Sequence, residues 1–543
     1  SFHRGTVQVM APEETDVPGQ LMTLVRKDLV RPDRAVLPGE DAFRFRHLLI
    51  RDAAYEALSK ADRSELHERF GRWLEDRGAD LAELHEIVGY HLGQAFRYRC
   101  ELGPADNKAR RLAADAARHL DAAGRRAMDR GDAGAAVSLL ERAESLLPPQ
   151  EINVARQHTL IWGLAESGRL DDAISRAARI AEECAAAGDR VGELMVRLTG
   201  GIWLINTDPD HGVPQVRALV EEARPSIKQD ADAARAVLEH AAGYLDYYHC
   251  HFGAAFAALT RAMNHARQAG DLWYEASMRP MAAGCIWQGP TPITEALRWL
   301  DDAQARSAAY QPQLEVPKTI MLAELGRFDQ ARSLLSETIA QLNERGLALF
   351  AAYSMGAAWR IEMLAGDDAA AERVSRRGCE QLERLGEHAW LSTQACQLAD
   401  ALYTLGRYEE AEQWALRGLA LGGKDDYATQ HAGLRVRSRL FARAGDFSAA
   451  FALAEEVNRL SETSDDPIDP GDAALNLAEI LHLTGGPARA EEMTERAIDW
   501  YRRKEATAYV ARARRLAARW TAERPTPQND VRSANVEERT DTP

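Results

Sequence analysis

Apolar residues recur through most of the chain at three- and four-residue intervals, the spacing of one buried helix face. A short phrase, clearest as Gly406-Arg407-Tyr408-Glu409-Glu410-Ala411, interrupts this pattern at regular steps. From Gly326 onward, successive copies are 40, 40, 39 and 40 residues apart. The copies begin at Gly131, Gly168, Gly326, Gly366, Gly406, Gly445 and Gly485. A nearly fixed interval of this size indicates a repeat array in place of one compact domain.

The residues of the phrase predict a tight turn between two helices. Glycine ends the first helix, because a helix C-terminus often needs a positive φ that only glycine adopts cheaply. Acidic residues such as Glu409 and Glu410 favour the positive end of the second helix's dipole. The small Ala411 lets two helices approach closely, and Tyr408 is expected to fill the joint between them. In this unit we predict a first helix over 390–405 and a second over 408–421.

Stacked hairpins of this kind predict an all-α protein in which neighbouring units supply a shared core. The phrase resembles the tetratricopeptide repeat, which implies a right-handed, tetratricopeptide-like solenoid of helical hairpins. The usual period of that repeat is about 34 residues. The longer interval here resembles the superhelical sensor regions of bacterial multidomain signalling ATPases, and we predict about ten units over residues 106–520. In one unit the match covers Leu398, Ala399, Leu402, Gly406, Tyr408, Ala411 and Ala415.

Three places fit the interval but carry an altered phrase. Asn206-Thr207-Asp208-Pro209-Asp210 and Gln288-Gly289-Pro290-Thr291-Pro292 contain prolines, and His251-Phe252-Gly253 follows Cys250 where glycine is expected. Two interpretations stay open for the proline-containing places. Either the solenoid bends there, or they are tolerated loops.

The first 58 residues have a different pattern. Leu21, Leu24 and Val25 fit a helix face, Phe43 and Phe45 alternate with arginines as in a strand, and a helix begins near His47. This order predicts the C-terminal part of a winged-helix domain over 1–58, followed by a helical linker over 59–105. Residues 521–543 are polar and lack periodicity, which predicts a disordered tail. Because the chain begins inside a fold, we expect a fragment whose N-terminal partner domains are missing.

A second resemblance concerns residues 20–147. Phe43-Arg44-Phe45-Arg46-His47-Leu48-Leu49-Ile50-Arg51-Asp52-Ala53-Ala54-Tyr55-Glu56 is similar to the segment that joins the ATPase module to the repeats in bacterial class III adenylate/guanylate cyclases. Glu65-Leu66-His67-Glu68-Arg69-Phe70 and Ile87-Val88-Gly89-Tyr90-His91-Leu92-Gly93-Gln94-Ala95 continue it. The resemblance implies a signal-transduction ATPase with numerous domains, whose ATP or ADP is bound by an upstream domain and not by this chain.

Many members of that class carry a Met-His-Asp motif in the winged helix, and its histidine senses bound ADP. Arg46-His47-Leu48 falls at the corresponding place, without the methionine and the aspartate. The resemblance therefore implies a nucleotide-sensing role for His47. The alternative is that His47 caps or packs the first turn of the winged helix.

Composition narrows the class of partner. The chain has 543 residues and a formal charge of −16, which argues against the clustered basic surface that nucleic acid requires. It contains no run of about 18 apolar residues and no signal peptide, so we expect a cytoplasmic protein without a membrane span. The six cysteines are scattered without a Cys-x-x-Cys pair and predict reduced thiols.

Candidate chemistry is sparse, and we expect no catalytic residue and no metal. No Gly-x-x-x-x-Gly-Lys-Ser/Thr loop occurs, so the phosphate cradle of an ATPase lies outside the chain. His249-Cys250-His251, with His240, raises a zinc hypothesis, but adjacent residues ligate one ion poorly and a repeat turn is the preferred interpretation.

Tryptophans supply the candidate ligand contacts. Five of them fall on predicted first helices, which line the concave surface in tetratricopeptide arrays: Trp162, Trp203, Trp287, Trp359 and Trp390. Packing between repeats is the alternative explanation for these positions, and the one we favour.

The preferred hypothesis is a regulatory sensor module without enzymatic activity of its own. It would bind a protein or small effector on its concave face and control an upstream ATPase, and through it a cyclase or kinase. One alternative is a transcription regulator of the same ATPase class. The other is a free-standing tetratricopeptide scaffold that assembles proteins.

Overall fold

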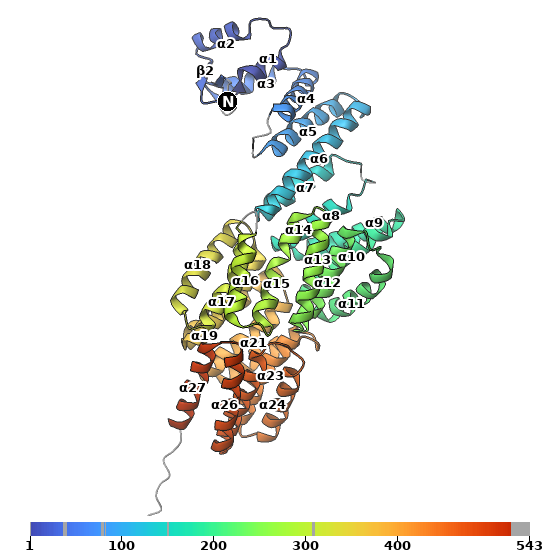
Figure 1. The fold of residues 1–543 in the computed structure, drawn as a ribbon. Helices are drawn as coiled ribbons and strands as arrows, with labels where there is room; N and C mark the ends of the chain where they lie inside the picture. The colour runs from blue at the N-terminus through green and yellow to red at the C-terminus, as the bar shows by residue number, and fades with distance from the viewer. Residues whose placement is uncertain are drawn as a thin grey trace, which may run out of the picture.

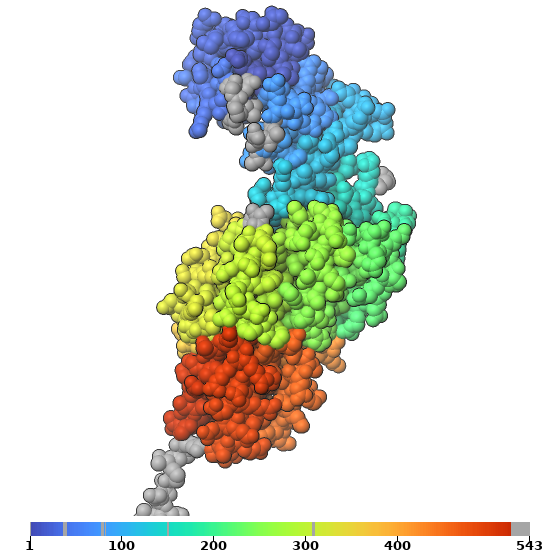
Figure 2. Space-filling view, viewed as in Figure 1, coloured from blue at the N-terminus to red at the C-terminus, as the bar shows by residue number. Residues whose placement is uncertain are grey.

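A computed structural model describes residues 2–35, 41–77, 81, 83–148, 151–306 and 310–522. In this described part the predicted fold class is confirmed, because the chain is a helical-hairpin solenoid of the tetratricopeptide type, preceded by a small segment with three strands (Figure 1). A narrow neck joins the N-terminal segment to the broad body of the array (Figure 2). The predicted disordered tail falls almost entirely on residues 523–543, which lie outside the described residues.

The N-terminal segment combines helices with a small antiparallel sheet of strand order β1-β3-β2. Val30 of β2 pairs with Phe45 of β3, and α2 buries Val17 and Leu21 against Phe43. Helix, hairpin and helix therefore follow in the predicted order, while the winged-helix assignment stays a prediction. The elements are β1 (Phe2–His3), α1 (Arg4–Met10), α2 (Val17–Arg26), β2 (Val30–Asp33), β3 (Ala42–Phe45) and α3 (Leu48–Glu56).

The range predicted as a helical linker contains two long helices, α4 (Lys60–Arg77) and α5 (Leu84–Leu102). They pack through Trp73 and Val88, which are buried in one cluster. The guanidinium of Arg69 donates to the carbonyl of Met10 at 3.1 Å, which ties the linker to the N-terminal segment.

Ten helical hairpins and a final helix make up the array within the described residues. The seven glycines that begin the phrase adopt φ values between +73° and +86°, the left-handed region that favours glycine. The first five hairpins are α6 (Asn107–Asp129) with α7 (Ala133–Ser145), α8 (Val154–Glu166) with α9 (Leu170–Ala186), α10 (Arg190–Thr207) with α11 (Pro209–Ser226), α12 (Asp232–Tyr248) with α13 (Phe252–Gln268), and α14 (Leu272–Ser277) and α15 (Arg279–Gln288) with α16 (Ile293–Ala305).

The second half of the array has the same plan. Its hairpins are η1 (Pro312–Leu314) and α17 (Glu315–Glu324) with α18 (Phe328–Glu344), α19 (Ala348–Ala365) with α20 (Asp368–Leu385), α21 (Ala389–Thr404) with α22 (Tyr408–Leu421), α23 (Tyr427–Ala444) with α24 (Phe447–Ser461), and α25 (Ile468–Leu483) with α26 (Pro487–Arg503). The last helix is α27 (Thr507–Ala522).

The hairpin at Gly406 shows how the residues of the phrase form a turn and a close helix crossing. α22 has the predicted bounds, and α21 begins and ends within one residue of its prediction. Ala411 is fully buried at the helix crossing. Tyr408 is 39% exposed and lies 5.5 Å from the ring of Tyr403. The aromatic residue therefore covers the joint from outside and does not fill it, which corrects the sequence-based expectation.

The array coils through two superhelical turns that touch each other. In each hairpin a hairpin turn joins the two helices, and an inter-hairpin loop leads on to the next hairpin. Hairpin turns of the first five hairpins contact inter-hairpin loops of the later ones, and the hydrogen bonds between them span 182 to 215 residues. Gly131 lies against Leu347, and these two residues are also more than 200 positions apart in the sequence. We call this row of contacts the seam.

The altered phrases all lie on the seam. The carbonyl of Asn206 accepts a hydrogen bond from the backbone N–H of His388 at 2.6 Å. The carboxylate of Asp465 accepts one from the N–H of Phe252 and one from that of Gly253, both at 2.8 Å. These hairpin turns therefore form hydrogen bonds with residues of the superhelical turn that follows.

At the third altered phrase, a lysine of the later superhelical turn supplies the contact. The ammonium of Lys504, whose residue is 1% exposed, donates to the carbonyls of Gly289 and Thr291. The altered phrases are thus contact points between superhelical turns, a role outside both sequence-based interpretations. Cys250 adopts the left-handed conformation at φ +57° without being glycine.

The hydrophobic core also crosses the seam. Its largest cluster runs from α6 to α15 and includes Leu347, Leu349 and Tyr427 from the later hairpins. Among the described residues, no helix is both long enough and apolar enough to cross a bilayer.

Candidate ligand-binding surface

The first helix of each hairpin faces the interior of the coil. In α8 every residue from Arg156 to Glu166 is buried. Contacts join α8 to α19 and α10 to α21, across the interior. The concave face is therefore covered by first helices of the opposite superhelical turn, because the coil is tight enough to bring the two turns together.

The five candidate tryptophans lie on first helices, as expected, but in different surroundings. Trp162 and Trp203 are each 6% exposed and contact each other. Trp287 donates to Glu324 at 3.1 Å and Trp359 is buried in the core of the second half. Trp390 is 36% exposed and stacks on Tyr353 at 4.6 Å. The structure thus brings two of the five together.

Trp162 and Trp203 belong to a buried group of aromatic rings from α8, α10, α12 and α14, which we call the inner cluster. Trp162 stacks on His240 with ring centroids 5.3 Å apart and an angle of 15°. Trp203 meets Trp162 edge-on at 4.7 Å, and Tyr274 meets His158 edge-on at 4.4 Å. The members are His158, Trp162, Trp203, His240, Trp273 and Tyr274, all at most 7% exposed.

Some ring nitrogens of the inner cluster have no hydrogen-bond partner. Thr199 Oγ1 donates its single hydrogen to the carbonyl of Met195 at 2.8 Å, so it accepts from His158 Nδ1 at 2.9 Å. His158 therefore carries its hydrogen on Nδ1 and presents a lone pair on Nε2. Four buried atoms of the inner cluster have no hydrogen-bond partner within the described part of the chain: His158 Nε2, Trp162 Nε1, Trp203 Nε1 and His240 Nε2. Each costs about 1–3 kcal/mol unless another molecule meets it.

The inner cluster is uncharged at neutral pH. Burial lowers the pKa of His158 to about 3 and the pKa of His240 to about 3. The cluster therefore offers two indole N–H donors and an imidazole lone pair between aromatic faces. Such a set can hold an uncharged polar group by hydrogen bonds and stacking.

A second inner group, on α21, α23 and α25, is charged and internally paired. Arg439 binds Asp400 at 2.5 Å, and Arg435 binds Asp472 at 2.5 Å. Burial alone would raise the pKa of Asp400, but Arg439 lowers it to about 2. The hollow beside these pairs measures about 10 Å³, the size of one water molecule. These pairs fix the stacking of the last hairpins and leave no room for a larger ligand.

His240 was a candidate zinc ligand from the sequence, whereas His158 and Tyr274 were not among the predicted site residues. In the structure His240 Nδ1 lies 2.9 Å from the hydroxyl of Tyr274, and His249 Nδ1 lies 2.6 Å from the carbonyl of Leu245. Within the described ranges no three His, Cys, Asp or Glu side chains are arranged to hold a metal ion. The spacing of His158 and Trp162, one helical turn apart, was the available signal for the inner cluster.

His47 lies at the N-cap position of α3, with extended backbone angles and an exposed side chain. Its side chain makes no capping hydrogen bond. α3 itself buries no residue, and Leu48 and Leu49 are 68% and 80% exposed. The nucleotide-sensing role of His47 stays a prediction.

Comparison with known proteins identifies no family for this chain. No protein-family model matches it, and no curated protein does. Among solved structures, a Rap protein complexed with competence and sporulation factor aligns with a TM-score of 0.36 and 11% identity, over 68% of this chain and 97% of that one.

Two further structures align over more of the chain. Yeast Tom70 gives a TM-score of 0.33 and 11% identity, over 86% of this chain and 100% of that one. A signal-transduction ATPase with numerous domains and a tetratricopeptide-repeat sensor, from Pyrococcus horikoshii, gives 0.27 and 13%, over 95% of this chain and 62% of that one.

Proposed function

We propose that the array is the sensor region of a signal-transduction ATPase and that it binds its effector at the inner cluster. The observation that carries this proposal is the set of four buried polar atoms without partners among the packed rings of the inner cluster. Buried polar groups are normally hydrogen-bonded, so four unpartnered atoms within one packed cluster favour a missing partner molecule. A small effector with hydrogen-bonding groups would satisfy these atoms, and a protein effector would have to insert such a group.

In this proposal effector binding is coupled to opening of the seam. Helices α8 and α10, which carry three residues of the inner cluster, contact α19 and α21 of the second superhelical turn, so an effector would enter when the two turns separate locally. Effector binding would then shift the array between two arrangements. α6 would pass this change through the linker to the upstream ATPase, and so to a cyclase or kinase output.

The domain assignment belongs to the same proposal. Residues 1–58 would be the end of a winged-helix domain and 59–105 the linker. His47, exposed at the start of α3, would contact the nucleotide of the upstream domain. ATP or ADP would be bound there and not by this chain.

Deletion tests the regulatory part of the proposal. Removing residues 106–520 from the full-length parent should change its output and abolish its regulation. A deleted parent whose ATPase and output activities are still regulated as before would rule out a sensor role, and would favour a scaffold.

A point variant tests the inner cluster. His158→Leu removes an unpartnered lone pair and leaves Thr199 bonded to Met195, so the chain should keep its melting temperature or gain a little. If a small-molecule extract of the source cells contains the effector, it should raise the melting temperature of the wild type. The same extract should leave the melting temperature of His158→Leu unchanged. His211→Leu, at a side chain that is 81% exposed, is the matched control. A thermal shift that survives His158→Leu unchanged would place the effector elsewhere.

A further inference from the structure

The seam covers hairpin turns of the first superhelical turn, whereas most hairpin turns of the second lie open within the described part of the chain. At Gly168, in the first superhelical turn, an added Cβ would lie against the side chain of Leu385. In the second, only Gly366 has such a contact, with Arg515 of α27. At the other four turn glycines an added Cβ would meet no described atom within 4 Å: Gly326, Gly406, Gly445 and Gly485. We call the row of these four open hairpin turns the turn edge.

The first residue of the second helix of a hairpin shows what the seam buries. Leu170, Phe252 and Ile293 occupy this position in the first superhelical turn and are at most 2% exposed. Tyr408 and Phe447 occupy it on the turn edge and are 39% and 42% exposed. The same repeat position is therefore buried where a later superhelical turn packs on it, and exposed where none does.

Tyr408 and Phe447 belong to an exposed apolar patch on two neighbouring hairpins. Leu405, at the end of α21, is 39% exposed. Phe451 lies one helical turn beyond Phe447 on α24 and is 38% exposed. Exposed apolar side chains that lie together mark interaction surfaces, whereas scattered single ones do not.

The opposite rim of the coil is open as well. It consists of the inter-hairpin loops of the first superhelical turn, and at Gly188 and Gly270 an added Cβ would meet no described atom within 4 Å. Val191 and Leu272, just beyond these glycines, are 37% and 62% exposed. Asp230, in the loop between α11 and α12, is exposed too. We call these three loops the loop edge.

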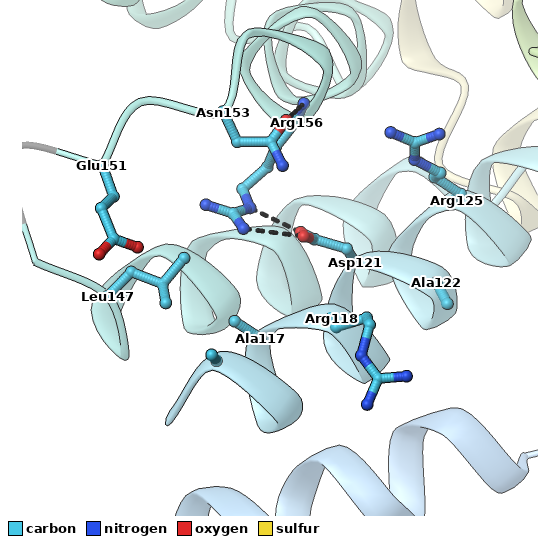
Figure 3. Close-up of a pocket in the computed structure, with 10 residues that line it drawn as sticks. Ala117, Arg118, Asp121, Ala122, Arg125, Leu147, Glu151, Asn153 and Arg156 are labelled. Carbon is cyan, nitrogen blue, oxygen red and sulfur yellow. Dashed lines mark hydrogen bonds and ion pairs between the residues drawn. The ribbon is translucent and has the colours of Figure 1, made fainter. Parts of the chain in front are cut away.

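The neck does not cover the loop edge. Nε and Nη2 of Arg156, near the start of α8, donate to the two carboxylate oxygens of Asp121 on α6 at 2.6 and 2.8 Å, which fastens the neck to the body (Figure 3). Figure 2 shows that the neck is narrower than the body. The loops beside the neck therefore stay accessible to another molecule.

The geometry points to head-to-tail association of two copies of this chain, in which the loop edge of one copy packs on the turn edge of the other. The seam shows that such surfaces fit each other, because it joins hairpin turns to inter-hairpin loops within one chain. The contact between copies would repeat this packing and would remove the apolar side chains of both edges from water.

The charges of the two edges also match. α22 has no side-chain N-cap, so the positive end of its dipole lies open on the turn edge. Within the chain, the carboxylate of Asp465 satisfies the N-terminus of α13 across the seam. Asp230 on the loop edge would supply a carboxylate of this kind to the second copy.

The two edges differ, so the interface is heterologous. Each pairing leaves one edge free on either copy, and association therefore continues until the copies close into a ring or grow into a filament. The interface lies on the two rims of the coil and does not involve the inner cluster. It is therefore independent of an effector bound there.

Sedimentation velocity of the full chain over a range of concentrations tests this proposal. The average mass of the wild type should rise with concentration above that of one chain. Leu272→Asp, on the loop edge, and Phe447→Asp, on the turn edge, should each weaken self-association by at least about tenfold, because a charge then faces an apolar surface. An equimolar mixture of the two variants should form dimers and nothing larger, since each variant keeps one intact edge.

Two further variants serve as checks. Phe451→Asp, on the same face of α24, should behave like Phe447→Asp. Met22→Asp, at a side chain of α2 that is 51% exposed, is the matched control and should associate like the wild type.

Three results would overturn the proposal. A wild type that stays a monomer at every concentration would leave the turn edge to a different protein. Self-association of Leu272→Asp alone, with its loss in Phe447→Asp, would mean that two turn edges meet each other. A mixture of these two variants that contains only monomers would exclude pairing of the loop edge with the turn edge.

Discussion

Asp465 caps a helix that begins 213 residues earlier in the chain. Its carboxylate accepts the backbone N–H of Phe252, at 2.8 Å, and so serves the N-terminus of α13. The local N-cap residue of α13, His251, provides no such bond. A role that is ordinarily filled by a neighbour in sequence is filled here by the next superhelical turn.

Asp465→Ala should lower the free energy of unfolding by about 1–2 kcal/mol, the usual cost of a lost N-cap. The effect that identifies loss of this particular contact is faster amide hydrogen exchange over residues 252–256. Asp446→Ala is the control, because Asp446 caps its own helix, α24, at Ala449. The control should cost a similar free energy and leave residues 252–256 unchanged. Equal exchange there in both variants would show that the seam does not support α13.

Glu387 makes stability depend on pH. It is fully buried, and burial raises its pKa from 4.5 to about 8, although it accepts hydrogen bonds from the backbone of Trp390 and Leu391. The folded protein therefore holds a proton that the unfolded chain releases above pH 4.5. The resulting stability is complete below pH 4.5 and is lost as pH rises to about 8.

Urea melts of the wild type and Glu387→Gln across this range measure the effect. Since one pKa unit corresponds to about 1.4 kcal/mol, the wild type should lose on the order of 3–5 kcal/mol relative to the variant. Glu380→Gln, at an exposed position of α20, should follow the wild type. Parallel curves for wild type and Glu387→Gln would contradict the buried, protonated state.

The glycine of the phrase is needed for its backbone conformation and not for space. Gly406 has φ +77°, and an added Cβ there would meet nothing within 4 Å. Gly406→Ala should therefore cost about 1 kcal/mol from conformational strain alone. Gly103 is equally open but has φ 172°, which any residue adopts. Gly103→Ala should be neutral or stabilise by up to about 1 kcal/mol. Equal thermal melts for the two variants would refute this reading.

Ala411 tests the close crossing of helices. It is fully buried on α22, so Ala411→Leu should overpack the crossing and cost about 1–3 kcal/mol. Ala420→Leu, on the exposed side of the same helix, is the matched control and should change stability by less than about 0.5 kcal/mol. A melt of Ala411→Leu that coincides with the wild type would mean that the crossing has spare room.

Local features of the fold could be predicted because local residues determine them. α22 begins at the aromatic residue of the phrase and ends at Leu421, as predicted, since glycine, acidic residues and alanine act within a few positions of one another. The seam could not be predicted in the same way. Its hydrogen-bonded partners are 182 to 215 residues apart, and whether they meet depends on small rotations summed over several hairpins.

The candidate site could be predicted only in part, because it too combines local features with contacts between residues far apart in sequence. Helical periodicity placed Trp162 and Trp203 on inner helices. It could not show that helices of a second superhelical turn contact α8 and α10, nor that His240, from a helix far along the chain, stacks on Trp162. A single histidine on an apolar helix gives no sign of its partner. The unpartnered nitrogens become visible only when the packed neighbours are known.

The seam gives this array a fixed length. In an open solenoid, a hairpin can be duplicated or lost with little harm, because each hairpin depends only on its neighbours. Here, inserting one hairpin between α13 and α25 would move Asp465 away from Phe252 by a whole unit, and would mismatch Lys504 and Gly289 at the same time. Descendants of this protein should therefore diverge by substitution while keeping their number of repeats.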